Sequence, residues 1–122
     1  MASLLILAFL FTSCAEKEPI DPTLAQQEFS IRSNTNGANY KIKVGLRIDY
    51  DAATKRHATV YVLDGENDFG FVANRCKEIT SSLATTGVVV ISIGYGRNRS
   101  IDYTPTKMSS VTGGCPEFLK FI

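Results

Sequence analysis

Apolar and polar residues alternate in two stretches near the start of the chain. In residues 40–48 (YKIKVGLRI), every second residue is apolar: Tyr40, Ile42, Val44, Leu46 and Ile48. Residues 28–33 (EFSIRS) follow the same pattern with Phe29 and Ile31. A period of two predicts half-exposed strands. The intervening NTNGAN is rich in residues that tolerate positive φ, so we expect an antiparallel hairpin.

Two later stretches are almost continuously apolar. Residues 58–65 (ATVYVLDG) and 87–94 (GVVVISIG) are rich in β-branched residues, as are parallel strands covered on both faces. Between them, one face of a crossover helix is predicted by four residues spaced four, three and four apart: Val72, Cys76, Ile79 and Leu83. A second helix is expected to begin near Pro116. The order of elements predicts an α/β fold, with the hairpin followed by a parallel strand–helix–strand unit.

The first residues predict an export signal. Residues 4–11 (LLILAFLF) are apolar throughout but too few to span a bilayer, and the FTSC that follows resembles the end of a bacterial lipoprotein signal. Cys14 would then carry the lipid; an ordinary cleaved signal and a buried helix are the alternatives, and no basic residue precedes the apolar run. We expect a signal over residues 1–14, an exposed tether over 15–27 and the domain over 28–122. The protein would be exported to the bacterial cell envelope and held on a lipid membrane, or else be secreted or periplasmic.

Composition excludes some classes of partner. The 122 residues include 13 Lys and Arg against 12 Asp and Glu, without the basic surplus of a nucleic-acid-binding protein. If Cys14 is acylated, Cys76 and Cys115 are the remaining cysteines. We expect two separate, partly buried thiols, with a disulfide as the alternative that an exported domain permits.

The Gly94-Tyr95-Gly96 stretch after the second apolar run could belong to a phosphate-binding turn. A dinucleotide fingerprint needs a third glycine where this chain has Arg99, and the residues that follow look like a loop and not like the start of a helix. We therefore expect no nucleotide. His57 is the only histidine and has no ligands at metal-binding spacing, so neither a metal nor another cofactor is expected.

Four motifs in order carry a more specific resemblance: Leu63-Asp64-Gly65, Ser92-Ile93-Gly94-Tyr95, Arg99-Ser100-Ile101-Asp102-Tyr103-Thr104-Pro105, and Gly113-Gly114 with Phe118-Leu119. Together they resemble the N-terminal half of an α/β-hydrolase of the enterobactin-esterase-like group, within the esterase D branch. The resemblance extends from Phe29 to Ile122 and implies an incomplete α/β-hydrolase fold that stops before the nucleophile elbow.

This resemblance implies a serine hydrolase of carboxylic esters, such as siderophore or acyl esters, acting on a small ester substrate. The triad serine, acid and histidine would lie downstream of Ile122, so no catalytic residue is expected within these 122 residues, which should be inactive alone. Val60 and Val62 would then lie on an unpaired, apolar sheet edge, which favours aggregation. The alternative is a short, non-catalytic lipoprotein that uses the half-fold as a binding module.

The resemblance also implies two groups of site residues. The turn after the third strand of α/β-hydrolases donates one N–H of the oxyanion hole, here the backbone of Gly65 or Glu66, with Gly65 allowing close approach and unusual φ. An ordinary strand-end turn is the alternative. The following residues would form the rim of the substrate pocket: Tyr95, Arg97, Arg99, Asp102 and Tyr103. A structural role is the alternative for this loop, with Asp102 paired to a nearby arginine.

Overall fold

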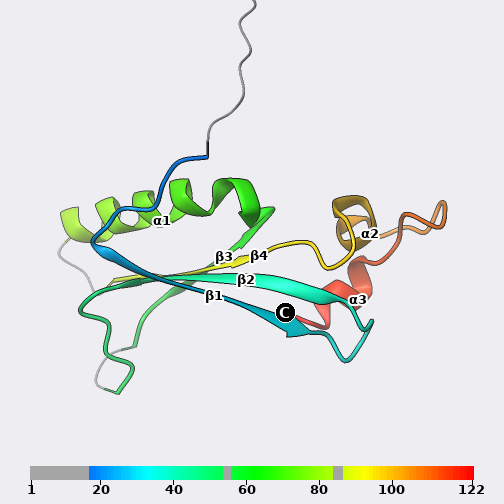
Figure 1. The fold of residues 1–122 in the computed structure, drawn as a ribbon, viewed down its shortest axis with the longest axis horizontal. Helices are drawn as coiled ribbons and strands as arrows, with labels where there is room; N and C mark the ends of the chain where they lie inside the picture. The colour runs from blue at the N-terminus through cyan, green and yellow to red at the C-terminus, as the bar shows by residue number, and fades with distance from the viewer. Residues whose placement is uncertain (1–16, 54–55, 84–86) are drawn as a thin grey trace, which may run out of the picture.

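The computed structural model describes residues 17–53, 56–83 and 87–122. The expected signal and Cys14 lie outside these ranges. The elements are β1 (Leu24–Arg32), β2 (Asn39–Arg47), β3 (Thr59–Leu63), α1 (Gly65–Ser82), β4 (Val89–Ile93), α2 (Arg99–Tyr103) and α3 (Cys115–Leu119). In Figure 1, α1 lies along one face of the sheet, and α2 and α3 lie together at one end.

The four strands form one mixed sheet in the order β1-β2-β4-β3. β1 and β2 pair antiparallel, with Phe29 opposite Ile42. β4 joins the hairpin antiparallel to β2, with Ile42 opposite Ile93, and β3 pairs parallel to β4, with Leu63 opposite Ile93. The predicted hairpin and the predicted parallel unit are both confirmed, and the crossover helix between the parallel strands is α1.

Helix α1 covers one face of the sheet. Phe69 and Ala73 pack against Val62 and Val90 in a buried cluster. The sheet comes close to the helix at Gly45, where a Cβ atom would lie 3.3 Å from the Phe69 ring. A side chain at position 45 would therefore press on the Phe69 ring.

The predicted face of α1 is partly wrong. Ile79 and Leu83 are 57% and 65% exposed, whereas Ala73 and Thr80 are buried. Small side chains let the helix lie close to the sheet, and the Thr80 hydroxyl donates to the Cys76 carbonyl at 2.8 Å, so its burial leaves no unpaired donor. Val72 and Cys76 of the predicted face do pack against the buried cluster, so apolarity placed the first two residues of the stripe correctly and the last two wrongly.

The opposite face of the sheet is covered mainly near α3. Tyr40, Ile42 and Ile93 pack there with Phe118. Farther along, Tyr61 is 53% and Leu63 is 44% exposed. Both faces of β4 are largely covered as predicted, but among the described residues β3 is covered on the α1 face only. It pairs with β4 alone there, so it is an edge strand, as expected.

The ordered domain begins earlier than the sequence indicates. β1 starts at Leu24, four residues before the predicted boundary at residue 28. The segment before it, residues 18–23, which we call the N-terminal strap, lies along α1 (Figure 1). The Asn74 amide donates to the Glu18 carboxylate (2.7 Å) and the Pro19 carbonyl (3.0 Å), and its oxygen accepts from the Asp21 N–H (2.8 Å). The strap is therefore bound to the domain and is not an exposed tether.

The two described cysteines, Cys76 and Cys115, are separate and half-buried thiols, as expected. Burial raises the pKa of the Cys76 thiol, which makes it a poor nucleophile at neutral pH. Among the helices of residues 17–53, 56–83 and 87–122, none has the length and apolar character to cross a membrane.

Candidate functional site

The carboxyl ends of the two parallel strands lie side by side at one edge of the sheet. Leu63 and Ile93 are the last paired residues of β3 and β4. The chain then enters α1 through Asp64, and from β4 it enters the loop of residues 94–98 before α2. Open α/β sheets bind their ligands at this edge, so the two predicted groups of site residues meet at the expected place.

The turn between β3 and α1 is built from two residues with different constraints. Asp64 has φ 62° and ψ 20°, in the left-handed region, and Gly65 does not. A Cβ atom at Gly65 would lie 1.7 Å from the Oγ of Ser92. The close contact with β4 therefore requires glycine at position 65, and its role beside an oxyanion stays a prediction. The prediction of unusual φ at Gly65 is wrong, because Asp64 takes the strained conformation.

The turn includes the first two backbone N–H groups of α1, those of the buried Gly65 and the exposed Glu66. Gly65 and Glu66 begin an 18-residue helix whose N-cap, Asp64, makes no side-chain capping bond. The Asn67 N–H bonds to the Asp64 carbonyl at 3.3 Å, while within the described part of the chain the N–H groups of Gly65 and Glu66 have no acceptor. Unpaired N–H groups at the positive end of a helix dipole can stabilise a negative charge, so the turn is chemically suited to an oxyanion.

Asp102 holds the loop after β4 together from inside. Its side chain is completely buried and accepts hydrogen bonds from the N–H groups of Gly96 (2.8 Å) and Arg97 (3.1 Å). The Tyr40 hydroxyl donates to it at 3.3 Å, and the Arg97 guanidinium lies 3.4 Å away. Burial also raises the pKa of Tyr40, which keeps its phenol a donor. Asp102 therefore has the structural role left open by the sequence, and its predicted place on the pocket rim is wrong.

Tyr103 connects this loop to the turn at Asp64. Its hydroxyl accepts from the Asp64 N–H at 3.2 Å and donates to the Ile93 carbonyl at 3.4 Å. Its ring lies edge-on to Tyr95 (centroids 5.6 Å apart) and Phe118 (5.1 Å). The two strands are thus joined beyond their last paired residues.

The two arginines of the predicted rim already have carboxylate partners. Arg97 pairs with Asp102, and the Arg99 Nε lies 2.9 Å from the Asp64 Oδ2. The Arg99 side chain is 71% exposed and Arg97 is 39% exposed, so both reach the surface. Tyr95, Arg97, Arg99 and Tyr103 thus follow the carboxyl end of β4, and neither arginine is a free cation. Their place on a pocket rim stays a prediction.

The sequence interpretation missed three features of the site. The residues after Gly96 form a short helix, α2, in which the Asn98 side chain accepts from the Ile101 N–H at 2.8 Å; the prediction of a loop was wrong. The signal for this helix in the sequence was Asn98, a residue type that commonly caps the start of a helix. The second missed feature is the hydrogen bond of Tyr40, which was expected only as an apolar strand residue. The third is the left-handed backbone of Asp64, for which the Asp-Gly pair was only a weak signal.

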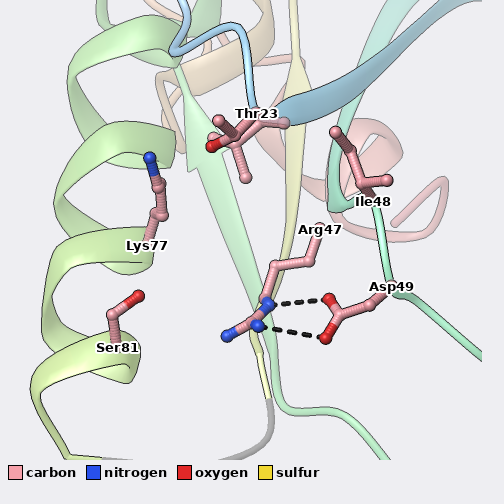
Figure 2. A pocket seen from close by; sticks show the side chains of 7 residues that line it. Thr23, Arg47, Ile48, Asp49, Lys77 and Ser81 are labelled. Carbon is pink, nitrogen blue, oxygen red and sulfur yellow. Dashed lines mark hydrogen bonds and ion pairs between the residues drawn. The ribbon is translucent and has the colours of Figure 1, made fainter.

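A cavity lies at the opposite end of the sheet. It measures about 270 Å³ and is lined by Thr23, Leu24, Arg47, Ile48, Asp49, Lys77 and Ser81. Figure 2 shows that Arg47 is held by Asp49, in a two-pronged contact of 2.8 and 3.0 Å, while Lys77 pairs with Asp21 at 2.5 Å. The two cations that line the cavity are thus neutralised. The cavity lies at the amino ends of β3 and β4, away from the turn at Asp64.

His57 lies at this same distant edge. Its Nδ1 is 2.9 Å from the Gly87 carbonyl, and its ring lies 4.7 Å from that of Tyr50. Nothing in the geometry connects it to the turn at Asp64. Across the described ranges, no three His, Cys, Asp or Glu side chains are grouped so that they could hold a metal ion.

No protein-family model matches the chain, and no curated protein does. Solved structures do resemble it. An IroE-like serine hydrolase from Shewanella oneidensis has a TM-score of 0.67 at 24% identity, over 80% of this chain and 35% of that one. The siderophore hydrolase EstA from Aspergillus nidulans has a TM-score of 0.64 at 29% identity, over 88% and 43%. The enterobactin and salmochelin hydrolase IroE has a TM-score of 0.58 at 19% identity, over 82% and 43%.

The chain thus resembles part of IroE-like serine hydrolases, as its four motifs indicated, and spans less than half the length of each of these structures. The predicted fold class, a partial α/β-hydrolase, is confirmed.

Proposed function

We propose that residues 17–122 form the N-terminal part of a serine carboxylic-ester hydrolase. The observation that carries this proposal is the likeness to siderophore and IroE-like hydrolases over 80–88% of the chain. The end of the sheet where β3 and β4 finish adds support, because the turn that follows β3 has unpaired N–H groups there. A siderophore ester is the first substrate to test, since one of the similar structures is named as a siderophore hydrolase and another as an enterobactin and salmochelin hydrolase.

Within this function, the turn at Gly65 and Glu66 would contribute to the oxyanion hole. Its N–H groups stand at the start of α1, where the helix dipole favours negative charge. A preorganised donor of this kind stabilises a tetrahedral intermediate by roughly 3 kcal/mol. The donor is a backbone group, so its removal needs a change in the backbone itself.

Proline at position 66 provides that change. Proline lacks an N–H and is tolerated in the first turn of a helix, and Gly65 has no Cβ to oppose the proline ring. Glu66→Ala is the matched control, because it removes the same exposed side chain and keeps the N–H. Gly65 is unsuitable for this purpose, since any side chain there would collide with Ser92.

The test uses a chimera in which residues 17–122 replace the matching part of the Aspergillus nidulans siderophore hydrolase. We expect the chimera to hydrolyse p-nitrophenyl acetate, Glu66→Ala to retain the rate, and Glu66→Pro to lower kcat about 100-fold or more. A chimera that folds by circular dichroism and hydrolyses no ester would refute the hydrolase proposal. An active chimera in which Glu66→Pro and Glu66→Ala have equal rates would refute only the assignment of the Glu66 N–H to the oxyanion hole.

The 122 residues alone are proposed to be inactive, because the resemblance assigns the triad to the part of the hydrolases that this chain does not cover. The purified chain should neither hydrolyse p-nitrophenyl acetate nor form an adduct with a fluorophosphonate that labels nucleophilic serines. A stoichiometric adduct detected by mass spectrometry would contradict this.

We also propose that Cys14 is acylated and holds the protein on a membrane of the cell envelope. The support is the apolar run followed by Thr-Ser-Cys in the sequence. Expression in a bacterium with a labelled fatty acid should give a labelled protein, and Cys14→Ser should abolish the label. Label retained in the Cys14→Ser variant would contradict the assignment.

A further inference from the structure

We propose that Tyr103 is a positioning residue that fixes the turn at Asp64 and thereby aims the N–H groups of Gly65 and Glu66. The inference rests on the proposed function of that turn. It assigns to Tyr103 a role through its hydroxyl, in addition to any contact its ring makes at the pocket rim.

The hydroxyl stands at the point where strand pairing ends. After Leu63 and Ile93, β3 and β4 diverge, one into α1 and the other into the loop before α2. The Tyr103 oxygen lies between the two chains, accepting from the Asp64 N–H at 3.2 Å and donating to the Ile93 carbonyl at 3.4 Å. It replaces a ladder hydrogen bond one residue beyond the sheet, and so keeps the two chain ends at a set separation.

The tyrosine is itself held firmly enough to act in this way. Its ring lies edge-on to both Tyr95 and Phe118, and its helix is capped by Asn98 and anchored by the buried Asp102. Burial raises the pKa of the Tyr103 phenol, so the hydroxyl keeps the proton that it donates to Ile93. A fixed ring and a protonated hydroxyl together define where the Asp64 N–H must lie.

Asp64 needs such support because its backbone is left-handed, with φ 62°. Only glycine enters this region without cost, and an aspartate held there costs of order 1 kcal/mol. The ion pair with Arg99 also touches Asp64 at 2.9 Å, but the Arg99 side chain is 71% exposed, and exposed pairs stabilise little. Of the two side-chain contacts that hold Asp64, the hydrogen bond from its N–H to Tyr103 is therefore the less exposed and the stronger constraint.

The first test measures amide hydrogen exchange by NMR in the full chain, comparing Tyr103→Phe with wild type. Phenylalanine keeps the ring packing and removes only the hydroxyl. We expect the Asp64 amide to exchange about tenfold faster, with altered chemical shifts at Gly65 and Glu66, while amides in the middle of α1 keep their rates. Tyr61→Phe is the matched control, because this tyrosine lies on β3 just before the turn with its side chain half exposed.

Two results would overturn the proposal. The Asp64 amide could exchange at the same rate in wild type and Tyr103→Phe, or all amides could accelerate together, which would mean general destabilisation. In the active chimera described above, Tyr103→Phe should also lower kcat several-fold at unchanged KM, and an unchanged kcat would refute the link to the oxyanion. The exchange experiment needs no catalysis, so an inactive chimera would count against the hydrolase proposal and leave the role of Tyr103 to be decided by exchange.

Discussion

Replacing Gly65 by alanine should destabilise the domain through one identifiable contact. The glycine begins α1 directly against β4, and a Cβ atom there would lie 1.7 Å from the Oγ and 2.5 Å from the Cβ of Ser92. Ordinary van der Waals contact begins near 3.4 Å. Rotation of the Ser92 side chain can move its Oγ away, but it cannot move its Cβ, so α1 or β4 must shift.

The expected cost follows from the size of this overlap. Overpacking by a single methyl group typically costs about 1–3 kcal/mol, and a contact that only a backbone shift can relieve belongs at the upper end. We therefore expect Gly65→Ala to lower the free energy of unfolding by about 3 kcal/mol. With a urea dependence of about 1–3 kcal/mol per M, the midpoint should fall by at least about 1 M.

A double-mutant cycle measures the contact itself. Ser92→Gly removes both atoms that collide, leaving the Ser92 Cα at 3.2 Å as the nearest atom. It should cost about 0.5–1 kcal/mol alone, because glycine weakens a strand, yet it should recover most of the loss caused by Gly65→Ala. Urea unfolding followed by circular dichroism gives the four free energies.

Gly37→Ala is the control for backbone strain. Gly37 has φ +70°, and a Cβ there would meet no atom closer than 3.9 Å, so its cost should not change in the Ser92→Gly background. If the costs of Gly65→Ala and Ser92→Gly simply add, the collision is not the reason for glycine at position 65, and the account of the turn given above is wrong.

Two further outcomes concern the strap and the open sheet face. Hydrogen bonds to the Asp21 carboxylate, the strongest from Lys77 and the next from Thr23, lower its pKa from the ordinary 3.8 to about 2. The carboxylate therefore adds stability that is fully present above pH 3.8 and is lost as the pH falls through about 2. The N-terminal strap should detach from α1 in that pH range, and the NMR chemical shifts of the Asp21 carboxyl and the Asn74 amide should change. Asn74 chemical shifts that stay constant down to pH 2 would contradict this prediction. Separately, Tyr61→Lys on the exposed face of β3 should reduce self-association of the chain in sedimentation velocity, because charge on an edge strand opposes strand addition. The control is Ile79→Lys on α1, where the side chain is already exposed and the effect should be smaller. Equal effects of the two substitutions would refute the role of β3 in self-association.

The sequence determined most of the elements of this protein. Alternation, continuous apolar runs and a Pro-led helix start depend on neighbours a few residues apart, so the hairpin, the parallel unit, α1 and α3 could be predicted from residue order alone. The close packing of Gly65 on Ser92 could not be predicted in this way, because a glycine between a strand and a helix can equally provide an unusual φ. The resemblance of four short motifs added the fold class, a partial α/β-hydrolase, but not the pairing of β2 with β4.

Only the tertiary structure decided how these elements use their side chains. The buried stripe of α1 depends on how close the helix lies to the sheet, which favours Ala73 and Thr80 over the more apolar Ile79. The burial of Asp102 and the bridge made by Tyr103 depend on partners from distant parts of the chain, 62 residues away for Tyr40 and 39 for Asp64. A local pattern carries no record of such partners, because each hydrogen bond exists only once the sheet has brought both ends together.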